Sequence, residues 1–230
     1  MNSSLQQLNG KILTTLVVAA LSAAMGNADA AMITIETGHS TAGAQASAEA
    51  YRNVVDAAVV AATPGYGTSH PALFDNLSNH GLFGGTTQDI AFRFTINFGV
   101  SAAQAGIWDF RAGVDFGRGG AMFLDGVALG FNSSDMWWDG SYGNSNQYLG
   151  FASTAPLAAG NHVLNIYGLE GCCDGGEQVQ YRLPGSDNFN TFGATTLGSI
   201  DSLSAVPEPA TYALFGIGLL GLSMARRRKG

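Results

Sequence analysis

The stretch Asp89–Val100, DIAFRFTINFGV, decides the fold class of this 230-residue chain. Large apolar residues recur at every second position, and alanine, arginine, threonine and asparagine stand between them. The apolar positions are Ile90, Phe92, Phe94, Ile96 and Phe98. A period of two residues is typical of a β-strand with one buried face and one face in water. The stretch therefore predicts a strand of this kind.

Similar patterns follow further along the chain. In Ile107–Asp115, IWDFRAGVD, apolar residues again alternate with charged residues or glycine. In Ala121–Phe131, AMFLDGVALGF, the dipeptide Asp125-Gly126 lies between two apolar runs, which predicts a tight hairpin turn, and a turn role for Asp125. Further strands are predicted at Gln147–Thr154, His162–Gly168 and Gln178–Leu183.

These short strands and glycine-rich turns predict a mostly β protein. The chain has 32 glycines, well above the usual share of about 7 %. We expect an antiparallel β-sandwich of jelly-roll type over residues 89–200. Residues 31–88 are less readable and form the N-terminal part of the body. There, the apolar stripe of Ser47–Thr63 predicts one short helix; its members are Tyr51, Val54, Val55, Ala58 and Ala62.

The first 30 residues have the pattern of a secretory signal peptide. Lys11 precedes the apolar run ILTTLVVAALSAAM, and Ala28 and Ala30 stand at the spacing of an A-x-A cleavage site. Cleavage after Ala30 is therefore expected. The alternative is a retained membrane anchor, although the apolar run is shorter than the roughly 20 residues that a span needs.

The end of the chain has a short apolar segment followed by a cationic cluster. Residues 210–225 carry no charge, and Arg226, Arg227, Arg228 and Lys229 follow at once. A helix of that length reaches about 24 Å, less than the hydrocarbon core of about 30 Å. The cations favour a C-terminus that stays in the cytoplasm. We expect a C-terminal apolar helix with a basic tail at 210–230, after a linker at 201–209, serving as a temporary anchor.

Val206–Ala210, VPEPA, the apolar stretch and the arginines together resemble the PEP-CTERM sorting signal of exopolysaccharide-producing Gram-negative bacteria. The motif residues are Pro207, Glu208, Pro209, Arg226, Arg227 and Arg228. The resemblance implies recognition by the membrane protease exosortase, with export by the secretion machinery. It also implies a transient stay in the inner membrane and a final place at the cell surface or in the extracellular matrix. The alternative is an ordinary C-terminal membrane helix after a proline-bearing linker.

The charge of the body argues against nucleic acid as a partner. Between residues 31 and 206 there are 15 acidic side chains, five arginines and no lysine, a net charge of about −10. Such a surface repels phosphate backbones.

The run Trp108–Phe131, followed by Gly160–Tyr167, resembles the lectin-like β-sandwich shared by protective-antigen toxins and flocculin-type adhesins. In calcium-dependent lectins of this type, two adjacent aspartates hold the ion under a sugar. The resemblance places Asp115 at the first position, while Phe116 occupies the second. Ca²⁺ is therefore a candidate ion, with Asp115, Asp135 and Asp139 as candidate oxygen ligands.

Cys172 and Cys173 are the only cysteines, and they are neighbours. In an oxidising compartment they can form a vicinal disulfide, for which the nearby glycines give backbone freedom. Such a ring could brace a loop or, together with Asp174, contact a ligand; free or intermolecular thiols are the remaining alternative. A zinc site is disfavoured because no second spaced pair exists. The sequence Cys-Cys-Asp-Gly also resembles the signature of one PEP-CTERM group.

The loop at residues 133–148 contains Trp137, Trp138 and Tyr142 among aspartates and asparagines. Exposed aromatics in such company hold sugar rings in many proteins. The alternative is that the tryptophans close the end of the sandwich.

No nucleophile elbow, H-E-x-x-H pair or phosphate loop occurs in the sequence, which disfavours an enzyme. The sequence predicts a non-catalytic envelope or matrix protein that binds or organises extracellular polysaccharide. Two alternatives stay open: a structural matrix protein without a defined ligand, and a hydrolase of envelope glycans that uses a carboxylate pair.

Overall fold

The computed structural model of the protein describes residues 32–194. The predicted signal peptide with Ala28 and Ala30, the linker and the C-terminal apolar helix lie outside these residues. The sorting residues lie outside them as well: Pro207, Glu208, Pro209, Arg226, Arg227 and Arg228. Between residues 32 and 194, no helix is both long enough and apolar enough to cross a membrane.

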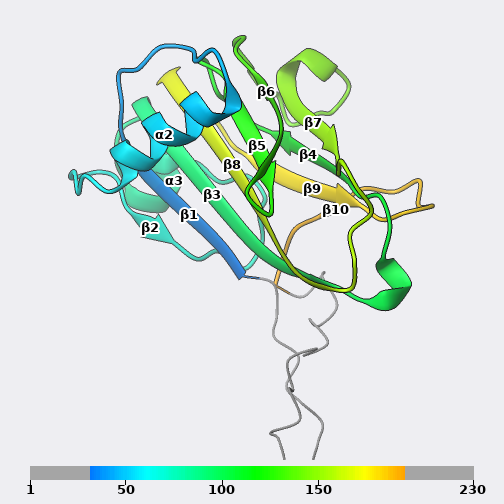
Figure 1. Ribbon diagram of the computed structural model, residues 1–230. Helices are drawn as coiled ribbons and strands as arrows, with labels where there is room; N and C mark the ends of the chain where they lie inside the picture. Colours follow the sequence, from blue (N-terminus) through cyan, green and yellow to red (C-terminus); the bar gives the residue numbers. More distant parts are fainter. Residues whose placement is uncertain (1–31, 195–230) are drawn as a thin grey trace, which may run out of the picture. The chain divides into compact units, whose positions relative to one another are not determined.

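Two antiparallel sheets make up most of the described chain (Figure 1), which confirms the predicted β-sandwich. The larger sheet has six strands, in the order β2 (Thr68–Ser69), β1 (Met32–His39), β3 (Gln88–Val100), β8 (Gly160–Cys172), β5 (Gly120–Leu124) and β6 (Val127–Asn132). The smaller sheet has four strands, in the order β10 (Asn190–Thr191), β9 (Gln178–Arg182), β4 (Asp109–Gly113) and β7 (Tyr148–Ala152).

The alternating stretch at Asp89–Val100 lies in the interior of the larger sheet, where β3 pairs with β1 and β8. Its five predicted apolar side chains are all buried. Opposite them, the apolar residues of the Trp108–Val114 stretch are buried too, and the rings of Phe98 and Trp108 lie 5.4 Å apart. The core between the sheets is therefore built largely from the two alternating patterns, since side chains of period two fill one face of each sheet.

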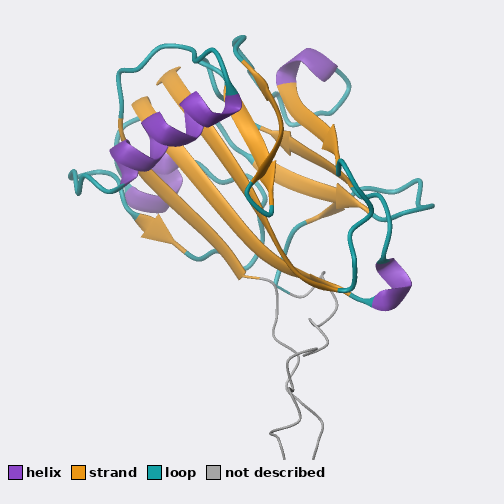
Figure 2. Ribbon diagram, viewed as in Figure 1, coloured by secondary structure: helices purple, strands orange, loops and turns teal. Residues whose placement is uncertain are grey.

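One helix covers the outer face of the six-stranded sheet (Figure 2). It is α2 (Ala48–Val59), which lies within the predicted range and begins after Ser47, whose side chain accepts a hydrogen bond from the Ala50 amide. Tyr51 and Val55 of α2 are buried against this face, and so is Ala91 of β3. The expectation that this face of β3 is in water is therefore wrong at Ala91, because α2 packs over it.

Residues 32–88 also contribute to the larger sheet. β1 pairs with β3 along its whole length, and β2 extends the sheet beyond β1. A second helix, α3 (Asn79–Phe83), begins after Ser78, so the prediction of a single helix is wrong. Five residues are too few to show a helical period in the sequence. Two short 3₁₀ turns are η1 (Ala102–Gln104) and η2 (Ser145–Gln147).

The predicted hairpin turn joins β5 to β6. Asp125 and Gly126 have φ angles of 50° and 79°, as a tight turn of this kind requires. The Asp125 carboxylate also lies 2.7 Å from Nδ1 of His162 and accepts a hydrogen bond from the Val163 amide. These contacts fasten the turn to β8 and give His162 a structural role.

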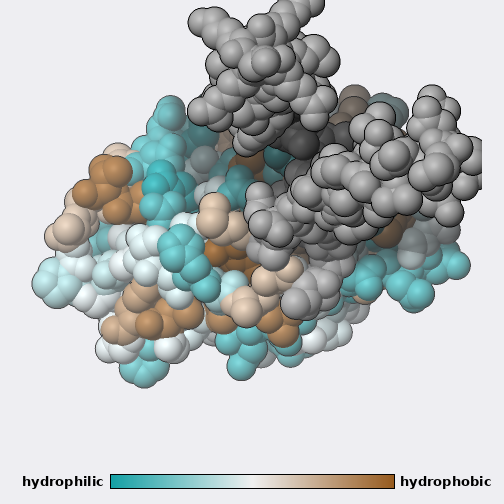
Figure 3. Space-filling model, turned by 90° about the horizontal axis from the view of Figure 1, so that it is seen from below, coloured by the Kyte–Doolittle hydropathy of each residue, from teal (hydrophilic) through white to brown (hydrophobic). Residues whose placement is uncertain are grey.

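The two sheets meet along β6 and β7. Gly130 of β6 lies so close to the ring of Phe151 of β7 that a Cβ at this position would clash with it. On the uncovered part of the face seen in Figure 3, small groups of hydrophobic residues lie among hydrophilic ones. Such a mixture is ordinary for the surface of a globular domain.

Candidate functional site

Loops from both sheets meet where β4 ends and β9 begins, and we call this region the loop end. The backbone of Phe116 pairs there with Met136, in the loop that follows β6. The Tyr142 hydroxyl donates a hydrogen bond to the Gln178 carbonyl oxygen and accepts one from the Gly113 amide. The structure therefore brings the loop at residues 133–148, with its aromatic side chains, to the end of the smaller sheet.

The loop end also contains four carboxyl groups that we call the acidic cluster: Asp115, Glu170, Asp174 and Glu177. Glu170 is fully buried, Glu177 is 1 % exposed and Asp115 is 6 % exposed. Glu170 accepts hydrogen bonds of 2.5 Å from the amides of Gly117 and Cys172. Oδ2 of Asp174 accepts one of 2.7 Å from the Asn79 amide. Oε1 of Glu177 and Oδ1 of Asp174 are buried without a hydrogen-bond partner among the described residues.

Burial and mutual repulsion raise the pKa values of the carboxyl groups in this cluster. Burial, with repulsion from Glu170 and Asp174, raises the pKa of Asp115 to about 7. Burial also raises the pKa of Asp174 to about 6, and that of Glu177 well above its ordinary range. The pKa of Glu170 is raised by burial as well, against the opposing effect of its backbone donors. Protonation lets close carboxyl groups stay away from water.

The three residues expected as Ca²⁺ ligands lie in different environments. Asp115 is buried, whereas Asp135 and Asp139 are exposed, and Oδ1 of Asp139 accepts a hydrogen bond from the Ser141 amide. Between residues 32 and 194, no three His, Cys, Asp or Glu side chains form a group that could hold a metal ion. Ca²⁺ binding stays a prediction.

Cys172 and Cys173 are joined by a disulfide bond of 2.06 Å at the end of β8, and the peptide bond between them is cis. Both residues are exposed, and Nε2 of Gln88 lies 3.4 Å from the Cys172 sulfur. The pair is therefore placed at the surface beside the acidic cluster, next to the first residue of β3. No described contact assigns it a ligand.

The three aromatic residues proposed as ligand contacts have different environments. Trp137 is 65 % exposed. Trp138 is half-buried, with its indole packed on Gly113, where a Cβ would clash with the ring. Tyr142 lies 5.5 Å from the Trp138 ring and 5.1 Å from the Tyr148 ring. Trp138 and Tyr142 therefore pack against the smaller sheet, and only Trp137 projects into water.

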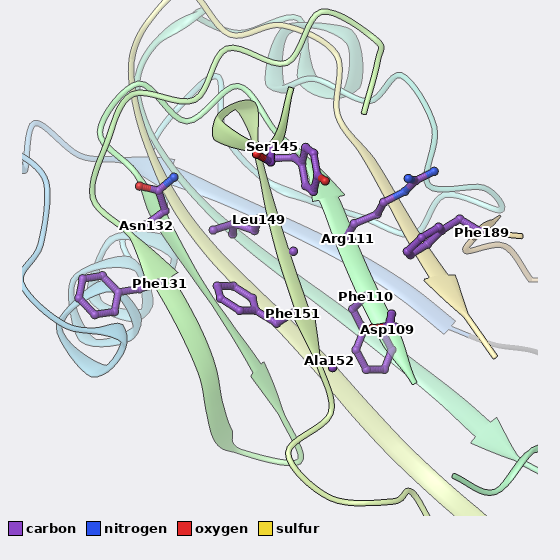
Figure 4. Close-up of a pocket in the computed structure, with 12 residues that line it drawn as sticks. Asp109, Phe110, Arg111, Phe131, Asn132, Ser145, Leu149, Phe151, Ala152 and Phe189 are labelled. Atoms are coloured by element: carbon purple, nitrogen blue, oxygen red, sulfur yellow. The ribbon is translucent and has the colours of Figure 1, made fainter. Parts of the chain in front are cut away.

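A second candidate site lies along β7, the edge strand of the smaller sheet, and we call it the Arg111 cleft (Figure 4). It has a volume of about 430 Å³ and is open to solvent. Its lining comes from β4, β6, β7, η2 and the loop before β10: Asp109, Phe110, Arg111, Phe131, Asn132, Ser145, Tyr148, Leu149, Gly150, Phe151, Ala152 and Phe189. The cleft combines aromatic rings with amide, hydroxyl and guanidinium donors.

Arg111 is held firmly at one end of this cleft. Its guanidinium carbon lies 3.8 Å from the ring centres of both Tyr142 and Phe189, which makes two cation–π contacts. Its Nε donates a hydrogen bond of 2.8 Å to the side chain of Gln180. Figure 4 shows the Phe189 ring beside the Arg111 side chain.

Sequence reasoning missed the Arg111 cleft. The alternation in Asp109–Gly113 does place Arg111 on the solvent face, but an arginine at such a position is ordinary. Phe189 and Asn132 come from other segments, and no local pattern shows that they line one cleft with Arg111. Only the pairing of the strands brings them together.

Comparison with known families identifies the end of the chain. Residues 205–229 match the model of the PEP-CTERM protein-sorting motif. The chain carries a PEP-CTERM sorting signal. This finding confirms the resemblance drawn from VPEPA, and it indicates that the protein is exported to the cell surface or beyond. No curated protein matches the sequence.

Several solved structures are similar to the described fold. A PA14 sugar-binding domain from an RTX adhesin has a TM-score of 0.48 at 14 % identity, over 75 % of this chain and 99 % of that one. The PA14 domain of the antifreeze protein MpAFP has a TM-score of 0.46 at 10 % identity, over 76 % of this chain and 94 % of that one. The Epithelial Adhesin 6 A domain from Candida glabrata, in complex with Galb1-3GlcNAc, has a TM-score of 0.45 at 9 % identity, over 77 % of this chain and 90 % of that one. Because these TM-scores lie below 0.5, they assign neither ligand nor activity to this chain.

Proposed function

We propose that the protein is an exported, non-catalytic protein that binds extracellular polysaccharide through the Arg111 cleft. The observation that carries this proposal is the lining of the cleft, which combines aromatic rings with hydrogen-bond donors. Sugar rings present apolar C–H faces and hydroxyl edges, so a site that offers aromatic rings and polar groups together suits them.

The size and arrangement of the cleft support a sugar ligand. A volume of about 430 Å³ lies within the range of roughly 300–1,000 Å³ of small-ligand sites. Phe131, which is 42 % exposed, and Phe151 supply rings on the side of β6 and β7. Asn132 and Ser145 supply an amide and a hydroxyl nearby. An open cleft of this kind can accept one unit of a chain that continues in both directions.

The alternative of a glycan hydrolase has less support. Glycoside hydrolysis generally uses two carboxyl groups on either side of the bond that breaks. Asp109 is the single carboxylate among the described residues that line the cleft, and it accepts hydrogen bonds of 3.1 and 2.9 Å from Arg182. In the acidic cluster the pKa values of Asp115 and Asp174 are raised to about 7 and about 6, but Asp115, Glu170 and Glu177 are buried and no member of the cluster lines the Arg111 cleft.

The export route is part of the same proposal. The sorting motif at 205–229 supports processing by exosortase near Pro207-Glu208-Pro209, after a transient stay in the inner membrane of a Gram-negative bacterium. Mass spectrometry of the protein recovered from medium or envelope should show a C-terminus near Pro209. An intact C-terminus in all recovered protein would contradict this route.

Binding to polysaccharide isolated from the envelope of producing cells tests the function. The full-length protein should bind it saturably, and Phe131→Ala should weaken binding several-fold because a ring is removed from the cleft. Trp137→Ala is the matched control, since it removes an exposed ring that does not line the cleft. Loss of binding with Trp137→Ala alone would move the site to the loop end. The absence of saturable binding would favour a matrix protein without a defined ligand.

A further inference from the structure

We propose that the Arg111 cleft selects an acidic saccharide, whose carboxylate is bound by the two terminal nitrogens of Arg111. This inference rests on the proposed function and names the class of sugar. It depends on three features of Arg111: the orientation of its guanidinium, its lack of an acidic partner, and the charge of its surroundings.

The contacts of Arg111 leave one edge of its guanidinium available. Two rings whose centres both lie 3.8 Å from the same carbon must lie on different sides of it, so Tyr142 and Phe189 flank the guanidinium. Gln180 occupies the Nε edge. The remaining edge carries the two Nη groups, and neither donates a hydrogen bond to a residue between 32 and 194. A planar carboxylate matches this edge with two parallel hydrogen bonds.

Most other arginines of the described chain already hold carboxylates. Arg93 pairs with Glu36 and Asp56, Arg118 pairs with Asp89, and Arg182 pairs with Asp109. The fourth, Arg52, contacts the Gly126 carbonyl oxygen and the Phe123 ring on the far side of the larger sheet. Arg111 is therefore the one arginine in residues 32–194 that lines the cleft without an acidic partner.

The charges around Arg111 favour the binding of an anionic ligand. The neighbouring Asp109 forms an ion pair with Arg182. Burial lowers the pKa of Arg111, and repulsion from Arg182 acts in the same direction. Between residues 32 and 194 there are 14 acidic side chains and only five arginines. None of these acids forms an ion pair with Arg111, so its positive charge is partly removed from water with no carboxylate beside it. A bound carboxylate would supply that compensation.

The Tyr148 ring favours a sugar acid over a simple anion. Tyr148 lines the same cleft and, by the register of β4 and β7, lies on the same face of the sheet as Arg111, so it would contact the sugar ring while Arg111 holds its carboxylate. Glucuronate and glucose form a matched pair of probes because they differ only in the carboxylate at C6. Acetate supplies the carboxylate without the ring.

The experiment is a titration of the full-length protein with these three compounds, followed by the NMR signals of the arginine Nε–H groups. Glucuronate should shift the Arg111 signal with a dissociation constant at least tenfold below those of glucose and acetate. Arg111→Gln should abolish glucuronate binding, and Arg111→Lys should weaken it, since lysine keeps the charge but loses the two-pronged geometry. Arg52→Gln is the control and should bind like the wild type. Thermal unfolding of each variant shows whether it is folded.

Three outcomes would overturn the inference. Equal affinity for glucose would show that the carboxylate is not recognised, and equal affinity for acetate would show a plain anion site. The absence of binding to all three probes, with envelope polysaccharide still bound saturably, would show that acidic sugars are not the ligand, while the proposed function stands. Failure to bind envelope polysaccharide as well would remove the proposed function too.

Discussion

Arg111 of β4 lies directly opposite Gly150 of β7 in the register of the smaller sheet. Residues paired in this way point to the same face, with Cβ positions about 5 Å apart. Because Gly150 has no side chain, the space beside Arg111 is open, and this space forms part of the cleft. A side chain at the position of Gly150 would normally fill this space beside Arg111. The cleft therefore depends on the absence of a side chain at one position.

Gly150→Asp should remove binding by placing a carboxylate beside Arg111. The φ angle of Gly150 is not in the left-handed region, and the nearest atom to an added Cβ is on the Tyr148 ring, which can move. Gly150→Asn, with nearly the same shape and no charge, is the control. We expect the aspartate variant to bind at least tenfold more weakly than the asparagine variant in a titration with glucuronate. Equal affinities would show that charge at this position is irrelevant.

Trp138→Ala should destabilise the protein, and Trp137→Ala should not. The Trp138 ring packs on Gly113 and Tyr142, so its removal should lower the free energy of unfolding by about 2–3 kcal/mol. Trp137 is 65 % exposed, and its removal should change that free energy by less than about 0.5 kcal/mol. Urea unfolding of the two variants measures the difference. A destabilisation of equal size in both would contradict the packing described for the loop end.

The acidic cluster should make the protein less stable at pH 8 than at pH 5. A carboxyl group whose pKa is raised on folding binds its proton more tightly in the folded state. Its contribution is complete below the ordinary pKa near 3.8 and is lost as the pH rises through the folded pKa, about 7 for Asp115 and about 6 for Asp174. Each kcal/mol lost should lower the melting temperature by about 2–4 °C.

Glu177→Gln tests the source of this pH dependence. Glu177 is buried and faces Asp174, Asp115 and Glu170, so replacing it by a neutral amide removes one ionisable group from the cluster. The fall in melting temperature between pH 5 and pH 8 should become smaller in this variant. Asp139→Asn, at an exposed position outside the cluster, should leave the fall unchanged. A pH dependence that is the same in all three proteins would exclude the cluster as its cause.

Removal of divalent cations should leave binding at the Arg111 cleft unchanged. The positive charge in this cleft comes from an arginine, and the described residues provide no group of ligands for a metal ion. Glucuronate affinities measured with EDTA and with added Ca²⁺ should therefore agree within about twofold. Complete loss of binding in EDTA would instead support the calcium requirement that the resemblance to lectin-like sandwiches implies.

The architecture could be predicted from the sequence because it rests on local patterns. The alternation of Phe92, Phe94 and Ile96 marks β3, and the Asp125-Gly126 pair marks the β5–β6 turn. The sorting motif could be recognised for the same reason, since its parts lie within 25 residues. The helix α3 was missed because five residues show no period.

The site was harder to predict because it depends on contacts between distant segments. The sequence predicts Trp138 and Tyr142 as ligand contacts, and this stays a prediction; it does not show that both pack against the smaller sheet, where Tyr142 lies over Arg111. Nothing near Arg111 in the sequence shows that Phe189, 78 positions later, lies on it. The burial of Asp115 among other carboxyl groups could not be predicted either, because it depends on residues far from it in the sequence.

The most direct test of this account is the affinity of the full-length protein for envelope polysaccharide of producing cells, measured side by side for the wild type, Arg111→Gln and Arg52→Gln. The account predicts saturable binding by the wild type and by Arg52→Gln, and a loss of at least tenfold in affinity for Arg111→Gln. Undiminished binding by a folded Arg111→Gln variant would contradict it.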